Sequence, residues 1–206
     1  MSVSRETLIS TYFGERQQEV LRYAEILATW GIERGLVGPK EGERIWDRHI
    51  ANCIPVTTLL SKEASLLDIG SGAGLPGIVI ALARPDLKVT LLEPLQRRID
   101  FLEEVVGELG IEVSVKRGRA ESFKGGFNYV TARAVAPLPK LATVSWHLVI
   151  GGGSLLAMKG EGAAAELEAA KLEAPKVFKK VAISEIHEIN LGELPLARVI
   201  ELKKAG

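Results

Sequence analysis

Residues 65–84 combine a short apolar strand, a glycine-rich turn and an apolar helix, and this succession constrains the fold more than any other feature. Residues 65–70 (SLLDIG) form an apolar run that glycine ends, and Pro76 suits the first turn of a helix. Glycines permit positive φ and close approach of a ligand to the backbone, and a helix N-terminus offers unpaired N–H groups. The pattern is typical of an α/β domain that binds a nucleotide-like ligand.

Beyond this turn, strand patterns and helix patterns alternate to the end of the chain, which predicts a doubly wound α/β sheet of seven strands. The short turn at residues 190–195 permits an antiparallel last strand. The expected strands lie at residues 65–70, 88–93, 111–116, 127–132, 154–159, 177–188 and 196–202, and the helices at residues 76–84, 96–109, 137–148 and 161–172.

The first 62 residues have helical rather than alternating strand and helix patterns. This difference predicts an N-terminal helical cap at residues 1–62, followed by the α/β domain at residues 63–206. Val20, Ala24 and Leu27 recur at helical spacing, and glycines between residues 31 and 38 break that helix. A second helix is expected at residues 41–60, with a kink near Pro55.

Composition indicates a soluble, cytoplasmic globular protein. The chain has 206 residues, and 26 basic and 26 acidic side chains give a formal net charge of +0, so no global field draws it to nucleic acid or membrane. A local basic patch can still bind RNA. The single cysteine, Cys53, fits a reducing compartment. We expect no signal peptide at the charged N-terminus and no membrane-spanning segment.

The glycine turn fits two classes of nucleotide-binding enzyme. Residues 72–77 match the dinucleotide fingerprint G-x-G-x-x-G, but that match alone is weak. An acid before three alternating glycines is typical of class I S-adenosylmethionine-dependent methyltransferases, and here the series is Asp68, Gly70, Gly72 and Gly74. A carboxylate at the strand end would repel a pyrophosphate and attract a sulfonium or ammonium group. Glu93 ends the second strand, where either class uses an acid to bind ribose hydroxyls.

The motifs together resemble those of the ribosomal RNA small subunit methyltransferase G family, also called glucose-inhibited division protein B. The resemblance covers roughly residues 20–202. The matching blocks, in chain order, are WDRHI at residues 46–50, DIGSGAGLPG at 68–77, RPD at 84–86, RAE at 119–121, TARAVAPL at 131–138 and AMKG at 157–160.

This resemblance implies a class I methyltransferase fold, S-adenosylmethionine as the cofactor, and methyl transfer to N7 of a guanine in the decoding-region (530) loop of 16S rRNA. It implies partners in the 16S rRNA, the small ribosomal subunit or its assembly intermediate, and we expect a monomer. Carried over by position, the cofactor-binding residues are Asp68, Gly70, Gly72, Gly74, Leu75, Glu93, Ala120, Glu121 and Arg133. Arg133 would also position the substrate as the catalytic residue, and Arg48, His49 and Lys159 are weaker expectations for RNA contact.

Two stretches depart from the family pattern. An Asn-Leu-Thr motif of many members is replaced by residues 35–38 (GLVG), and an Asp-Ser pair by Asn52-Cys53. No Asp/Asn-Pro-Pro-aromatic motif for amino-group methylation follows the fourth strand, and Cys53 is the only cysteine available as a nucleophile. Guanine N7 requires neither group, and we expect no metal.

Other functions remain open from the sequence. A class I methyltransferase could act on another RNA base, a protein or a small molecule. A nicotinamide-dependent oxidoreductase is disfavoured by Asp68, and a ribosome-assembly factor that binds S-adenosylmethionine only structurally is the non-enzymatic alternative.

Overall fold

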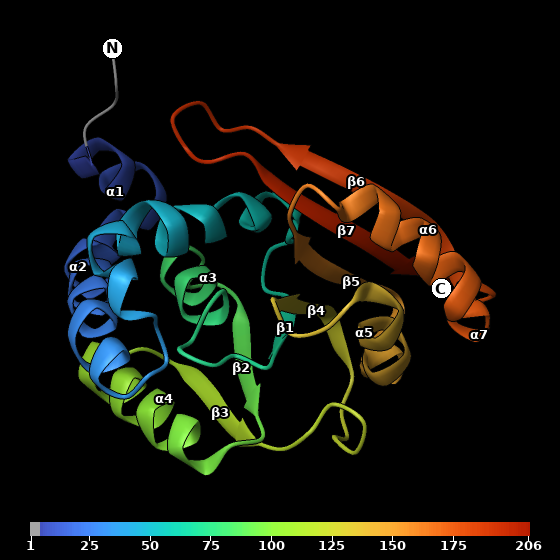
Figure 1. The fold of residues 1–206 in the computed structure, drawn as a ribbon, viewed down its shortest axis with the longest axis horizontal. Helices are drawn as coiled ribbons and strands as arrows, with labels where there is room; N and C mark the ends of the chain where they lie inside the picture. Colours follow the sequence, from blue (N-terminus) through green and yellow to red (C-terminus); the bar gives the residue numbers. More distant parts are fainter. Residues whose placement is uncertain (1–4) are drawn as a thin grey trace.

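The computed structural model describes residues 5–206, so the first four residues of the expected cap lie outside the described residues. In this described part, seven strands form one sheet in the order β3-β2-β1-β4-β5-β7-β6 (Figure 1). The strands are β1 (Ser65–Ile69), β2 (Lys88–Glu93), β3 (Val113–Arg117), β4 (Phe127–Arg133), β5 (Val149–Lys159), β6 (Val181–Ile189) and β7 (Ala197–Lys204).

The strand directions confirm the expected doubly wound sheet with an antiparallel last strand. β1 pairs in parallel with both β2 and β4, and β7 lies antiparallel between β5 and β6. The strand order therefore reverses between β1 and β4, and the carboxyl ends of these two strands flank the position where ligands bind in open α/β sheets.

Helices cover both faces of the sheet (Figure 1). One apolar core joins the sheet to α1, α2, α3 and α4, and a second joins the other face to α5, α6 and α7. The helices are α1 (Arg5–Phe13), α2 (Gln17–Ile26), α3 (Gly77–Ala83), α4 (Gln96–Leu109), α5 (Leu138–Ser145), α6 (Ala163–Glu173) and α7 (Pro175–Phe178). None of the helices within residues 5–206 is both long and apolar enough to cross a bilayer.

The expected helix at residues 41–60 is replaced by a series of short 3₁₀ and π turns: Pro39–Arg44, Ile45–Ile50, Ala51–Cys53 and Pro55–Leu59. Pro55 has no N–H to donate, and the hydroxyls of Thr57 and Thr58 bond to the carbonyls of Ile54 and Pro55. These local bonds compete with a regular helix.

The cap shares its core with the sheet. Tyr23 and Ile54 are fully buried in the same apolar cluster as Leu66 of β1 and Ile78 of α3. The boundary at residue 62 stays a prediction, since nothing in the packing separates a core of the cap from that of the sheet.

Two strands begin four or more residues away from the expected position. β5 begins at Val149 rather than residue 154, because the three glycines at 151–153 continue the strand past an irregularity in its pairing with β4. The strand expected at residues 177–188 begins at Val181, because Pro175 starts the short helix α7.

Candidate active site

The glycine loop lies at the carboxyl end of β1 and is folded back onto β2. The backbone N–H groups of Gly70 and Ser71 donate to the carbonyl of Leu92, at 2.8 and 3.3 Å. Gly70, Gly72 and Gly74 have φ of +66°, +57° and +97°, which side chains rarely adopt. The loop therefore depends on glycine for its conformation.

Close contacts also require the absence of side chains in this loop. A Cβ on Gly70 would lie 2.8 Å from Val135 Cγ2, and one on Gly74 would lie 2.9 Å from the Tyr23 hydroxyl. The Tyr23 hydroxyl donates to the carbonyl of Ala73 at 2.8 Å, so α2 holds the loop from the side of the cap.

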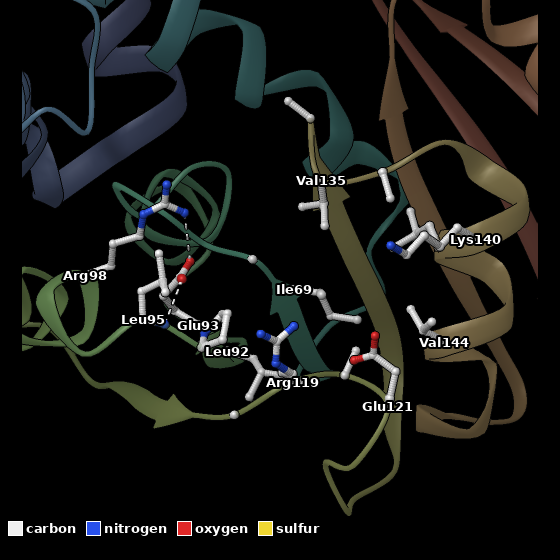
Figure 2. Close-up of a pocket in the computed structure, with 17 residues that line it drawn as sticks. Ile69, Leu92, Glu93, Leu95, Arg98, Arg119, Glu121, Val135, Lys140 and Val144 are labelled. Carbon is white, nitrogen blue, oxygen red and sulfur yellow. Dashed lines mark hydrogen bonds and ion pairs between the residues drawn. The ribbon is translucent and has the colours of Figure 1, made fainter.

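Glu93 is fully buried at the end of β2 and ties the loop to the start of α4. Its carboxylate accepts a hydrogen bond from the backbone N–H of Gly72 at 3.1 Å. It also accepts from the backbone N–H of Leu95 at 3.1 Å, and Arg98 Nη1 lies 3.5 Å away (Figure 2). Backbone donors on both sides thus fix the carboxylate.

Asp68 lies behind the glycine loop. It is fully buried, and its Oδ2 accepts from the backbone N–H of Gly77 at 3.1 Å, at the start of α3. Its Oδ1 has no hydrogen-bond partner among residues 5–206. Burial raises the pKa of Asp68 to about 7, while the neighbouring Ser71 hydroxyl and the hydrogen bond from Gly77 lower it.

A cavity of about 390 Å³ opens in front of the loop, between the ends of β1, β2 and β4 and the helix α5 (Figure 2). Four of the expected cofactor residues line it: Gly70, Glu93, Ala120 and Glu121. The remaining walls come from Ile69, Leu92, Pro94, Leu95, Arg98, Gly118, Arg119, Ala134, Val135, Ala136, Lys140, Leu141 and Val144.

The other expected cofactor residues support this cavity from outside its lining. Gly72 contacts Glu93, Gly74 turns the loop, and Leu75 is buried in the core beside α3. Arg133, at the end of β4, is half-buried, and its Nη2 lies 3.2 Å from His49 Nδ1.

The three residues expected at the RNA lie in different surroundings. Arg48 and His49 both contact Glu41, through Arg48 Nη1 at 2.9 Å and His49 Nε2 at 3.0 Å. Lys159 has a side chain only 10% exposed, and its Nζ contacts Glu166 Oε2 at 2.7 Å and the carbonyl of Ala136 at 2.8 Å. The structure thus places His49 next to Arg133, joins Arg48 to His49 through Glu41, and places Lys159 beneath the loop that follows β4.

Sequence reasoning assigned no role to several residues at the cavity, notably Leu95, Arg98, Arg119, Val135 and Lys140. The sequence does indicate that Arg98 lies near Glu93, because Arg98 belongs to the first turn of the helix that follows Glu93. No local sequence pattern places Val135 and Lys140 at the cavity. Their position depends on the path of the chain after Ala134, which adopts a positive φ of +56°.

Nucleophilic catalysis finds no support at Cys53. The thiol is fully buried, and burial raises its pKa to about 11, so it is protonated at neutral pH. Within residues 5–206, no group of three His, Cys, Asp or Glu side chains is arranged to hold a metal ion.

The residues present fit S-adenosylmethionine. Glu93 offers a buried carboxylate to ribose hydroxyls at the cavity wall, and Leu92, Ala120 and Val144 supply apolar surface for a planar base. The unpartnered oxygen of Asp68 behind the loop favours a ligand that carries positive charge rather than a pyrophosphate.

Comparison with known proteins agrees with this geometry. The family model described as rRNA small subunit methyltransferase G (GidB) matches residues 16–192. The chain belongs to this family. Members of the rRNA small subunit methyltransferase G family are S-adenosylmethionine-dependent, and the expected recognition, fold and cofactor are thereby confirmed.

Curated relatives with the name Ribosomal RNA small subunit methyltransferase G match most of the chain. The protein of Mycobacterium sp. (strain KMS) is 47% identical over 201 residues, which cover 94% of this chain and 88% of the relative. The protein of Thermobifida fusca is 49% identical over 191 residues, which cover 91% of this chain and 80% of the relative. The protein of Kineococcus radiotolerans is 51% identical over 166 residues, which cover 79% of this chain and 65% of the relative.

Solved structures show the fold. A methyltransferase from Pyrococcus furiosus superposes with a TM-score of 0.63 at 16% identity and covers 94% of this chain and 100% of its own. An S-adenosylmethionine-dependent O-methyltransferase from Thermotoga maritima gives a TM-score of 0.59 at 16% identity, with 81% and 70% covered.

Proposed function

We propose that this protein transfers a methyl group from S-adenosylmethionine to N7 of a guanine in the decoding-region (530) loop of 16S rRNA. The observation that carries the proposal is the family match over residues 16–192, together with a cavity that has Glu93 and the glycine loop in its walls. We further propose that the enzyme is a cytoplasmic monomer that acts on the small ribosomal subunit or its assembly intermediate.

In this proposal the cavity residues bind and orient the cofactor. Glu93 accepts hydrogen bonds from the ribose, Ala120 and Glu121 flank the adenine, and Gly70 allows close approach of the methionine portion. When bound, the cofactor supplies an electrophilic methyl group on a sulfonium whose leaving group is a neutral thioether.

Guanine N7 has a free lone pair at neutral pH, so the protein needs no general base for this reaction. Its task is to hold the base in line with the methyl group, and such positioning supplies roughly 7–11 kcal/mol. We assign this role to Arg133. The exposed side chains of Leu95 and Val135 at the cavity offer apolar surface beside the reacting groups.

Among the proposed RNA contacts, Arg48 is the most accessible, with a side chain 55% exposed. Lys159 is instead suited to support the loop after β4, because its ammonium group already contacts Glu166 and the carbonyl of Ala136. A guanine in a single-stranded loop would reach the cavity more readily than a stacked base.

The test is transfer of labelled methyl from S-adenosylmethionine to small ribosomal subunits and to stripped 16S rRNA that lack the native modification. Borohydride reduction and aniline cleavage then locate N7-methylguanine. A single cleavage in the decoding-region loop is expected, and the better substrate of the two identifies the form of RNA that the enzyme reads. Methyl label at another atom of the 16S rRNA, or on another RNA, a protein or a small molecule, would contradict the proposed substrate and identify a different one.

A further inference from the structure

Three polar side chains form a continuous row from the cap to the end of β4. Glu41 Oε2 lies 3.0 Å from His49 Nε2, and His49 Nδ1 lies 3.2 Å from Arg133 Nη2. Glu41 and His49 belong to the short helical turns of the cap, whereas Arg133 belongs to the sheet. The row therefore connects the two parts of the chain at the strand end where the reaction is proposed.

The chemistry of the three groups determines the state of the histidine. A guanidinium can only donate, so His49 Nδ1 must be the acceptor in its contact with Arg133. The ring proton then lies on Nε2, from which it donates to the Glu41 carboxylate. The other oxygen of Glu41 accepts from Arg48 at 2.9 Å, which fixes the carboxylate in turn.

Electrostatics favour the same neutral form of the ring. The pKa of His49 is lowered, first by burial and then by the Arg133 cation, while the hydrogen bond to Glu41 opposes the shift and Arg48 adds to it. At neutral pH the imidazole is thus uncharged and keeps a lone pair toward Arg133.

A neutral acceptor has a consequence that a carboxylate would not have. It fixes the direction of the guanidinium without cancelling its charge. No carboxylate among residues 5–206 lies within ion-pair distance of Arg133, and the charge of Arg133 lowers the pKa of Asp68. Arg133 is therefore held and half-buried, without a carboxylate of the described chain in direct contact.

We propose that Glu41 and His49 act as a positioning pair that holds Arg133 as an oriented cation without a direct ion pair for methyl transfer. The inference rests on the proposed function and deepens it, because it assigns the cap a part in the active site. Neither Glu41 nor His49 needs to touch the reactants. Both act through Arg133.

Substitutions of His49 separate positioning from packing. His49→Asn places an amide oxygen near the former Nδ1 and can still accept from Arg133, whereas His49→Phe fills the space and cannot. We expect His49→Phe to lower kcat on small subunits by about 10- to 100-fold, the loss typical of one hydrogen bond to a charged group. His49→Asn should restore most of that loss, and both variants should melt near the wild-type temperature.

A second histidine–glutamate pair provides the matched control. His187 Nε2 lies 2.8 Å from Glu201 Oε2 between β6 and β7, and the His187 side chain is 20% exposed against 18% for His49. His187→Phe should leave kcat unchanged. Equal losses in His49→Phe and His49→Asn, or a comparable loss in His187→Phe, would overturn the positioning role.

Nuclear magnetic resonance of the ring nitrogens tests the row in the free protein, without substrate. The chain has only three histidines, which makes assignment direct. We expect His49 to carry its proton on Nε2 at pH 7, Glu41→Gln to weaken that preference, and Arg133→Gln to raise the pKa of His49. A proton on Nδ1, or a charged ring at pH 7, would overturn the proposal. If the wild-type protein methylates no guanine N7, the proposed function is wrong. The resonance measurement still determines the protonation state of His49 independently of that result.

Discussion

At the scale of single residues, a glycine can be required for two reasons. Its backbone can have a positive φ, or a neighbouring atom can leave no room for a side chain. Gly70 and Gly110 have similar φ, +66° and +60°, but only Gly70 has a close neighbour. A Cβ on Gly70 would lie 2.8 Å from Val135 Cγ2, whereas a Cβ on Gly110 would meet nothing within 4 Å. The two positions therefore allow backbone strain to be measured apart from steric overlap at the cavity.

We expect Gly110→Ala to lower the free energy of unfolding by about 1–2 kcal/mol, the cost of a left-handed residue with a side chain, and to leave cofactor affinity unchanged. Gly70→Ala carries the same cost and also displaces Val135, so it should weaken cofactor binding at least tenfold. Chemical denaturation and calorimetric titration of the cofactor measure the two effects. Equal affinity in both variants would contradict the close approach at Gly70.

The buried carboxyl of Asp68 predicts proton release when the cofactor binds. Because its pKa is raised to about 7, the free folded protein retains this proton at pH values where an ordinary carboxyl has lost it. A ligand with an ammonium group stabilises the ionised form and lowers that pKa, so binding between pH 6 and 7 should release up to one proton. Cofactor affinity should accordingly rise as pH increases toward 7.

Calorimetric titration in two buffers of different ionisation enthalpy measures this release. Asp86→Asn is the control, because Arg84 holds the pKa of Asp86 well below its usual range and no proton is available there. Proton uptake on binding, or identical release in Asp68→Asn, would contradict the assignment.

At the scale of elements, α2 contacts the cofactor loop directly through Tyr23. The hydroxyl is buried and donates to the carbonyl of Ala73 at 2.8 Å. Tyr23→Phe leaves that carbonyl without its side-chain donor, and we expect a loss of about 1 kcal/mol in unfolding free energy. Cofactor affinity should fall with it, because the loop loses its anchor. Tyr12→Phe, at a half-buried ring of α1, should change neither quantity.

Elements with strong periodicity were predictable from the sequence, and irregular ones were not. The bounds of β2 and α4 match expectation because apolar alternation and the stop at Gly110 are local signals. The turns of residues 39–59 escaped prediction because buried contacts with the sheet, rather than propensity, hold them. At the site, Gly70 and Glu93 follow from strand ends, but Val135 and Lys140 enter the cavity through the tertiary path after β4.

At the scale of the whole molecule, one apolar core includes residues of both the cap and the sheet, so we expect the two parts to unfold as one cooperative unit. Removal of residues 5–62 would expose the side chains that pack beneath it, among them Leu66, Ile78 and Leu91. We expect a chain of residues 63–206 to lack a cooperative thermal transition and to bind a hydrophobic dye. Circular dichroism and dye fluorescence, with the full chain as reference, check this. A sharp transition in the shortened chain would instead establish an independent domain.

The short turns between residues 45 and 57 combine irregular backbone geometry with a buried inner side, where Ile50, Cys53, Ile54 and Val56 are all 0% exposed. Irregular segments usually exchange their amide hydrogens quickly, through local opening. We expect the amides of these four residues to exchange as slowly as those of the central strands β1 and β2, because their side chains belong to the same apolar core. Some of the slowest amide exchange of the molecule would then occur in a segment that secondary structure alone would describe as loop-like.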